Sequence, residues 1–299
     1  MTISKEVIKS GVVSLLKGDD HRKAVYKLVS ASFIEVSISF FKKIVEAKLK
    51  NNTIDLTWYQ KTFIENEKTK KFIASHAGLS LKSISNLRKT KKKSIVLEES
   101  LSNFNELVQV INSLCDHSDV EIQLSITFNS VTVQLNLSES LLVINALGMR
   151  RNQIRGGIWS SFGKQTEFPL LEAMCQIFHV PKENYKSGNR KGVREVDFSL
   201  IDDKGNTKKC EVKLQGKGNP EGADSTFARD SNIFIAGTLS DTNIQQLNKS
   251  GIHWVELMRR HGFLRFGKIL KELNIPHRPL NLKSGKDIDN LIEQTVFRS

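Results

Sequence analysis

The spacing of apolar residues changes near residue 119, and this change limits the possible folds more than any other feature. Residues 25–47 carry apolar side chains at helical intervals with few helix breakers. Residues 120–128 and 131–137 instead alternate apolar and polar side chains on either side of Asn-Ser, a pattern typical of a β-hairpin. The chain therefore combines a helical first part with a later part that contains strands.

Beyond the hairpin, helical and strand patterns follow one another in a regular order. We predict helices at residues 138–148, 164–179, 241–249 and 261–273, and strands at residues 195–201, 207–214, 232–236 and 252–257. This order indicates an α/β (α+β) protein. We place the domain boundary between residues 115 and 120, giving regions 1–118 and 119–299, and leave open a boundary as late as residue 148.

The charge of the chain favours a polyanionic partner. The 299 residues include 45 Lys and Arg against 32 Asp and Glu, a formal net charge of +13. Basic residues outnumber acidic ones two to one in the first hundred positions. A basic region of this kind is typical of nucleic-acid binding, although a lysine-rich surface alone would give the same count.

Cysteine usage and hydropathy favour the cytoplasm. Cys115, Cys175 and Cys210 are odd in number and irregular in spacing, which argues against a disulfide framework or a zinc cluster. No apolar run approaches the roughly 20 residues of a membrane span. We also see no signal peptide at the N-terminus and expect a cytoplasmic protein.

Two carboxylates and a lysine lie in the strand pair that Asp202-Asp203-Lys204-Gly205-Asn206 joins. Alternate residues of a strand share a face, so Glu211 and Lys213 should point the same way, with Cys210 and Val212 on the other face. A hairpin here can bring Asp197 beside both of them.

Such a group needs a chemical explanation, because unpaired carboxylates repel and are costly to bury. Mg²⁺ prefers oxygen ligands and commonly binds phosphate oxygens as well. We therefore predict that Asp197 and Glu211 bind Mg²⁺ and that Lys213 assists water in phosphodiester hydrolysis. A salt-bridged surface face is the structural alternative.

The helix, two strands, helix and strand of residues 160–260 resemble the core of the PD-(D/E)XK nuclease superfamily. The resemblance implies a mixed central sheet flanked by helices and a further acidic residue on the first helix. Glu167 is the matching candidate, with Glu172 as the alternative. This chain departs from the pattern at Val196, where the superfamily often has proline.

The segments 155–164, 210–221 and 223–231 resemble type II restriction endonucleases, in particular the CfrBI-like group. This resemblance implies a homodimeric, Mg²⁺-dependent enzyme that cuts both DNA strands within a short palindrome. It also implies a cognate DNA methyltransferase in the same system.

A glycine-rich loop follows the second acidic strand. Its glycines allow close backbone approach to phosphates, so Lys217, Asn219 and Arg229 are candidates for DNA contact. Arg155, before two glycines, has a similar interpretation as part of a backbone clamp. Ordinary turn-forming loops would explain the same glycines.

Residues 70–89 match the helix-turn-helix pattern. Ala74 is small where two helices would cross, Gly78 provides the turn, and Ile84 and Leu87 would pack the second helix back. A helical hairpin with a basic surface is the alternative.

The outward positions of this segment are candidates for DNA contact. Ser80 is the expected N-cap of the second helix. The proposed base-contacting and phosphate-contacting residues are Ser80, Lys82, Ser83, Asn86 and Arg88.

These features together predict a cytoplasmic, Mg²⁺-dependent DNA endonuclease of the type II restriction class. Two rival hypotheses remain. The first is a repair or junction-resolving nuclease with the same core, which would recognise DNA structure. The second is a non-catalytic regulator that binds DNA through residues 70–93, with structural carboxylates.

Overall fold

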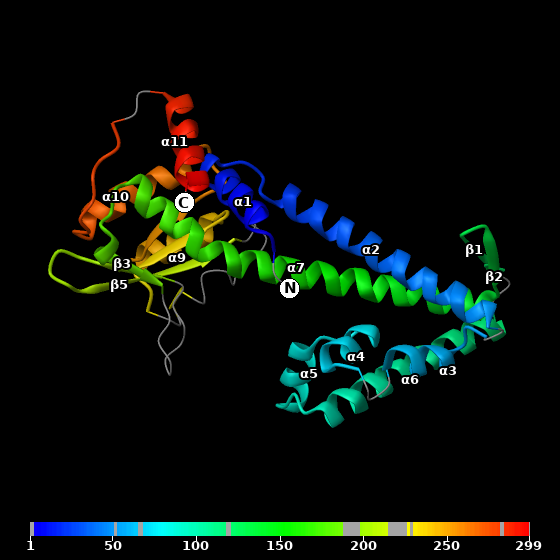
Figure 1. Ribbon diagram of the computed structural model, residues 1–299. Helices are drawn as coiled ribbons and strands as arrows, with labels where there is room; N and C mark the ends of the chain where they lie inside the picture. The colour runs from blue at the N-terminus through cyan, green and yellow to red at the C-terminus, as the bar shows by residue number, and fades with distance from the viewer. Residues whose placement is uncertain are drawn as a thin grey trace. The chain divides into compact units, whose positions relative to one another are not determined.

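The structure, a computed structural model, contains two compact units (Figure 1). It describes residues 3–50, 53–64, 68–117, 121–187, 198–214, 226–227, 230–281 and 284–298. One unit, here called the sheet unit, joins Met1–Tyr26 to Trp159–Ser299, and the other, the helical unit, is Lys27–Ile158.

The units cut across the regions indicated by the sequence. The change of apolar spacing near residue 119 lies inside the helical unit, which also contains the hairpin. The first helix of the chain belongs to the sheet unit instead. The separate roles expected for residues 1–118 and 119–299 stay predictions.

The helical unit consists of helices and one hairpin. Its elements are α2 (Arg22–Leu49), α3 (Leu56–Tyr59), the π-helical turn η1 (Gln60–Ile64), α4 (Lys70–His76), α5 (Leu81–Arg88), α6 (Lys93–His117), β1 (Leu124–Phe128), β2 (Val131–Leu135) and α7 (Leu137–Ile177). Both α2 and α7 contribute residues to both units.

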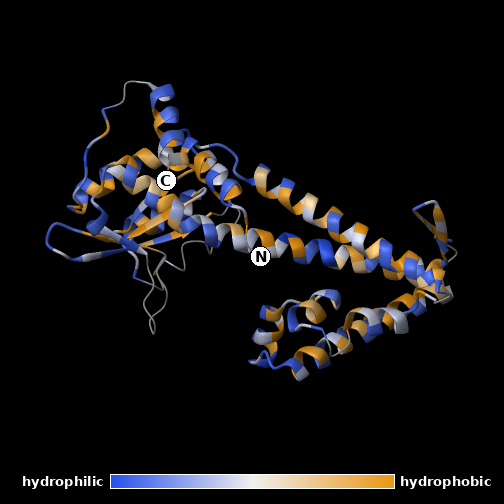
Figure 2. Ribbon diagram, in the orientation of Figure 1, coloured by the Kyte–Doolittle hydropathy of each residue, from blue (hydrophilic) through white to orange (hydrophobic). Residues whose placement is uncertain are grey.

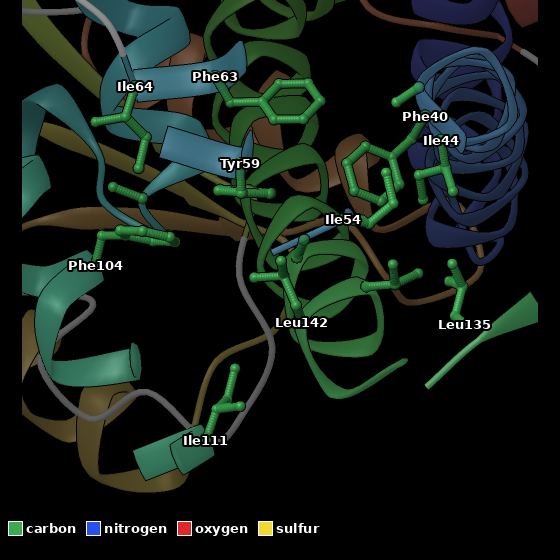
Figure 3. Packing of buried hydrophobic residues seen from close by; sticks show 14 of the residues in the cluster. Phe40, Ile44, Ile54, Tyr59, Phe63, Ile64, Phe104, Ile111, Leu135 and Leu142 are labelled. Atoms are coloured by element: carbon green, nitrogen blue, oxygen red, sulfur yellow. The ribbon is translucent and has the colours of Figure 1, made fainter. Parts of the chain in front are cut away.

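The core of the helical unit is rich in aromatic rings. Phe40 of α2, Tyr59 of α3 and Phe63 of η1 lie close together in Figure 3, with Phe104 of α6 near them. The Tyr59 and Phe104 rings stack with their centroids 5.3 Å apart. Burial of such large apolar surfaces is the main force that holds these short helices together.

The hairpin predicted around residue 129 is confirmed. Strands β1 and β2 pair antiparallel, and Asn129 and Ser130 connect them with φ values of 49° and 63°. Positive φ at both central residues is characteristic of the tight turns that match strand twist, and asparagine tolerates it well.

Helix α7 is longer than predicted and runs without a break. The helices expected at residues 138–148 and 164–179 are both present as parts of α7, but the break expected between them is wrong, because Gly156 and Gly157 lie inside the helix, as does Pro169. Its N-terminus also differs, since Asn136 Oδ1 accepts from the Glu139 amide at 2.9 Å, whereas Ser138 was the expected cap.

The sheet unit surrounds one five-stranded mixed sheet. Its strands are β3 (Tyr185–Ser187), β4 (Phe198–Ile201), β5 (Thr207–Lys213), β6 (Ile233–Ala236) and β7 (His253–Glu256), in that spatial order. Its other elements are α1 (Lys5–Lys17), η2 (Lys182–Asn184), α9 (Asp241–Lys249), η4 (Gly262–Leu264), α10 (Arg265–Glu272) and α11 (Gly285–Arg298).

Strand β5 lies at the centre of the sheet and joins its two halves. It pairs antiparallel with β4 and parallel with β6, and β7 continues the parallel half. The short strands β4 and β6 consist mostly of hydrophobic residues, and the sheet carries much of the hydrophobic colour of its unit in Figure 2. Such runs are expected of strands that are covered on both faces.

Helices cover both faces of this sheet. On one face, the Phe168 ring of α7 lies 5.8 Å from that of Phe198 in β4. On the other face, Phe234 and Ala236 of β6 pack with Leu247 of α9. The mixed, helix-flanked sheet predicted for this part of the chain is therefore present.

None of the helices in the described part of the chain is both long and apolar enough to cross a membrane.

Candidate active site

Glu211 and Lys213 meet on the central strand β5. They are two residues apart, so they share a face of the strand, and the Lys213 ammonium Nζ lies 2.7 Å from Glu211 Oε1. The Glu211 side chain is fully buried, whereas the Lys213 side chain is one-third exposed. The pair therefore reaches from the sheet interior to the surface.

The strand fixes this pair through its other face. Cys210 and Val212, on the opposite face, are fully buried. Glu211 lies beside Phe234 in the parallel register, and Lys213 lies beside Ala236. Because these β6 neighbours belong to the apolar cluster under α9, the carboxylate sits among hydrophobic side chains.

A buried carboxylate in such surroundings must be neutralised or hydrogen-bonded. Lys213 supplies one opposite charge to Glu211. A divalent cation at the same carboxylate would be chemically compatible, because carboxylate oxygens are ligands that Mg²⁺ prefers. The Glu211 carboxylate is therefore a chemically suitable ligand for the expected Mg²⁺.

The described residues provide only part of a metal site. Among them, no group of three or more His, Cys, Asp or Glu side chains could hold a metal ion. Asp197, the other expected ligand, lies outside the described residues. The nearest described position is Phe198, whose partner in the antiparallel register is Cys210.

Glu167 lies on α7 and is half-buried. Its neighbour Phe168 packs this part of the helix on β4, on the sheet face that carries Cys210 and Val212. Glu167 is therefore placed beside the sheet, and its participation in the site stays a prediction. The alternative residue, Glu172, forms an ion pair with Lys182 at 2.5 Å.

Another buried carboxylate, Glu256, was missed in the sequence. It ends β7 on the same sheet face as Lys213, with Ala236 between them in the register. Glu256 Oε1 accepts from the Leu239 amide at 3.1 Å, and its other oxygen pairs with Arg259. An acidic residue within the apolar run 252–257 was the available signal.

The two glycine-rich segments differ in what the structure describes. Lys217, Asn219 and Arg229 lie outside the described residues. Arg155 lies in the middle of α7, and its side chain is exposed to solvent. The part of the clamp expected from the Gly156 and Gly157 amides is wrong, because they lie within a continuous helix, where the helical ladder uses them. DNA contact by the Arg155 side chain stays a prediction.

Residues 70–89 form two helices joined by a turn. Gly78 makes the turn with φ +78°. Ala74 and Ile84 are buried with Val96 of α6, which packs α5 back as expected. Leu87 does not pack back: its side chain is 70% exposed.

The predicted outward positions of α5 are all exposed. Ser80 and Ser83 form a reciprocal capping box, each hydroxyl accepting from the other residue's amide at 3.0 Å. Arg88 Nε donates to Glu99 at 2.5 Å. Lys82 and Asn86, four residues apart, share a face of the helix.

A buried acid and a lysine on the central strand of a mixed, helix-flanked sheet are compatible with a nuclease core. The model of the CfrBI restriction endonuclease family matches residues 5–244. The chain therefore belongs to the CfrBI restriction endonuclease family, and a restriction endonuclease is a nuclease that acts on DNA. No curated protein and no solved structure matches the chain.

Proposed function

We propose that this protein is a type II restriction endonuclease that makes Mg²⁺-dependent double-strand cuts at a short palindromic DNA site. One observation carries the proposal: the buried Glu211 carboxylate contacts the partly exposed Lys213 ammonium on the central strand. In a member of a restriction endonuclease family, this pair is the natural candidate for phosphodiester hydrolysis.

The proposed metal ligands are Asp197 and Glu211, in a core of the PD-(D/E)XK type. Phe198 of β4 and Cys210 of β5 pair across the two strands. In the sequence, Asp197 directly precedes Phe198 and Glu211 directly follows Cys210. The Asp197 carboxylate would be the second oxygen ligand, as the resemblance to that core implies.

When bound, Mg²⁺ would supply positive charge that stabilises the negative charge developing on the phosphate. Lys213 is accessible enough to hold a water molecule against the phosphorus and to stabilise that charge directly. Glu167, which lies beside the sheet, is proposed as a further acidic residue of the active site.

DNA contacts are proposed from two parts of the chain. The helix-turn-helix-like segment would present Ser80, Lys82, Ser83, Asn86 and Arg88, and near the cleavage site Arg155, Lys217, Asn219 and Arg229 would contact the backbone or bases. Lys82 and Asn86 are the best placed for base contact, because both are exposed on one helix face.

The proposal includes a homodimer, because a palindromic site is most simply read by a twofold symmetric protein. It also includes a cytoplasmic location, since all three cysteines are free. A cognate methyltransferase would protect the host's own sites and need not contact this protein.

Digestion of a long phage DNA tests the proposal. With Mg²⁺ we expect discrete fragments whose mapped ends share one sequence, and with a chelator we expect intact DNA. A smear, or cutting only at junctions and damaged sites, would support the structure-selective rival. Intact DNA in both samples, with a band shift unaffected by chelator, would support the regulator.

Two variants assign the chemistry. Asp197→Ala and Lys213→Ala should abolish the fragments while leaving the DNA band shift in chelator. Asp203→Ala and Lys204→Ala, in the exposed turn of the same hairpin, are matched controls that should cut at the wild-type rate. Wild-type cutting by a folded Asp197→Ala protein would refute the assignment.

A further inference from the structure

The helical unit contains a cavity for which the proposed cleavage chemistry has no use. Its volume is about 140 Å³, and residues of α2, α3, η1, α4 and α7 line it. Phe40, Tyr59 and Phe63, three of the rings around it, are seen in Figure 3. An apolar cavity of about 150 Å³ in another protein binds benzene, so this space suits a six-membered ring.

The walls of the cavity are suited to stacking. His76 and Phe72 of α4 complete the aromatic lining. The His76 ring stacks on Phe63 with an interplanar angle of 10° and centroids 4.8 Å apart. The centroid of the Phe72 ring lies 4.0 Å from that of His76. Aromatic side chains in such arrangements bind nucleobases through their π-faces.

Two cations line the same cavity, and none of the described residues around it is acidic. The cations are Arg150 of α7 and Lys43 of α2, whose Nζ lies 5.2 Å from the Phe63 centroid. Arg150 Nη1 donates to Gln153 Oε1 at 2.5 Å, but its Nε is buried with no hydrogen-bond partner. The Arg150 side chain is half-buried, and a cation that loses water without a counter-charge carries a cost that a bound anion would remove.

The titration behaviour of the lining agrees with an uncompensated positive charge. Burial lowers the pKa of Arg150. Burial also lowers the pKa of His76 to about 4, and the charges of Arg150 and Lys43 act in the same direction. His76 is therefore a neutral ring at physiological pH and adds no charge to the lining.

We propose that this cavity binds one pyrimidine nucleotide, with its ring among the aromatic side chains and its phosphate toward Arg150 and Lys43. The lining would suit several kinds of aromatic anion. We choose a nucleotide because the protein is proposed to act on DNA, so this step rests on the proposed function. The choice of a pyrimidine follows from the volume, because a purine has a second ring.

Calorimetric titration of the full-length protein in chelator tests the proposal. The ligands are the four deoxynucleoside monophosphates, deoxycytidine, inorganic phosphate and benzoate. We expect dCMP or dTMP to bind saturably and more tightly than the purine nucleotides, the nucleoside, phosphate or benzoate. Arg150→Met should weaken this binding by about tenfold or more, the effect of one charge-assisted hydrogen bond.

Two further variants guard against misfolding. Lys43→Met changes an exposed position and should also weaken binding. Arg151→Met is the matched control, because the Arg151 guanidinium lies 5.6 Å from the Phe33 centroid and does not line the cavity. Without ligand, Arg150→Met should melt close to the wild type, since it removes a half-buried charge that has no counter-charge among the residues lining the cavity.

The proposal is overturned if no nucleotide binds, if both Arg150→Met and Lys43→Met bind as the wild type does, or if benzoate binds as tightly as dCMP. DNA cutting by the same wild-type preparation separates the two proposals. A preparation that cuts DNA with Mg²⁺ but binds no nucleotide refutes the cavity alone.

Saturating duplex DNA added in chelator identifies the source of the nucleotide. If DNA displaces dCMP, the cavity receives a base extruded from the duplex, since flipped bases are held by stacking and polar contacts in such pockets. If dCMP binds equally with DNA present, the ligand is the free nucleotide. Both results require the cavity to be a nucleotide site.

Discussion

Each unit buries a carboxylate in its interior, and the two are compensated differently. In the helical unit, Glu139 of α7 accepts from Lys48 Nζ at 2.6 and 2.8 Å, and from the amides of Ile54 and Asn136 at 2.9 and 3.0 Å. In the sheet unit, Glu211 has its charged partner two residues away on the same strand.

We propose that the difference separates a structural charge from a chemical one. Glu139 joins the end of α2, the segment before α3 and the start of α7, so its role is to hold distant parts of the unit together. The Lys213 partner of Glu211 lies on the same strand, and its side chain reaches solvent. A buried acid whose cation is local and accessible is better suited to chemistry than to holding the fold.

Glu211→Gln is expected to have the largest effect on function. It keeps the shape of the side chain but removes its charge, so Mg²⁺ binding and charge stabilisation should be lost. We expect cutting to fall by roughly 100- to 1000-fold or more, as when a group that stabilises transition-state charge is removed. Single-turnover cleavage of a mapped fragment measures it.

Thermal unfolding is the control for that variant. Glu211→Gln removes one charge of a buried pair, so some loss of stability is expected. If cutting by the folded protein stays at the wild-type rate, Glu211 resembles Glu139 and the contrast between the two units fails.

Glu139→Ala should have the opposite profile. It leaves the Lys48 ammonium and two amides without their shared acceptor, which should cost about 3 kcal/mol of unfolding free energy. The folded fraction should cut DNA at the wild-type rate. Denaturant unfolding followed by cleavage assays below the transition measures both, and a specific loss of cutting would contradict the structural role.

Acid should affect the helical unit through His76. The buried His76 has a pKa of about 4 against an ordinary value of 6.5. Between these values the unfolded chain binds a proton that the folded chain does not, so stability falls as the pH is lowered from about 6.5 to 4, by roughly 3 kcal/mol in all. Unfolding of the wild type and of His76→Phe over this range measures the difference, which should vanish in the variant.

The sheet unit should respond in two pH ranges. Burial lowers the pKa of His21 below its ordinary 6.5, so stability falls as the pH passes below that value, and Asp289 responds at lower pH. The contact with His261, and then the Arg260 guanidinium, lowers the pKa of Asp289 below its ordinary 3.8. This stabilisation is complete well above pH 4 and is lost as the pH falls through the lowered value. If Asp289→Asn loses as much stability as the wild type when the pH is lowered to 3, this assignment is contradicted.

Ser80→Ala should have the smallest effect. It removes the N-cap of α5, and such losses typically cost about 1 kcal/mol. Leu87→Ala on the same helix is the control and should change stability by less than about 0.5 kcal/mol, because this side chain is exposed. Urea unfolding of both variants gives the comparison, and equal losses would mean that the cap contributes nothing.

Much of the fold follows from local chemistry. The capping of α5 by Ser80 and the turn at Asn129 and Ser130 were predictable because they depend on neighbouring residues only. The strands β4 to β7 also lie within the predicted ranges, since short apolar runs between polar turns suit buried strands.

The errors arise where packing overrides local preference. Gly156, Gly157 and Pro169 argue for a break in α7, but Ile158 and Phe162 bury their side chains along it and hold the helix together. Leu87 fits the helix-turn-helix pattern and is nevertheless exposed. The three-residue strand β3 is too short to give a periodic signal.

The candidate site was predictable to the extent that it lies in one strand. The period of two placed Glu211 and Lys213 on one face without knowledge of the fold. Glu256 depends on the parallel pairing of β6 and β7, which no local pattern specifies. The position of Glu167 beside the sheet likewise depends on how α7 packs on β4.

The sheet unit is built from two stretches of sequence, and this affects how it forms during synthesis. Lys17 of α1 pairs with Glu293 of α11 at 2.5 Å, across 276 residues of chain. At roughly 5–20 residues per second, translation separates these two partners by tens of seconds. The contiguous helical unit can fold meanwhile, but the sheet unit cannot be completed until α11 has left the ribosome. A ribosome-bound chain stalled before α11 should therefore protect the helical unit from protease and leave α1 open to cleavage.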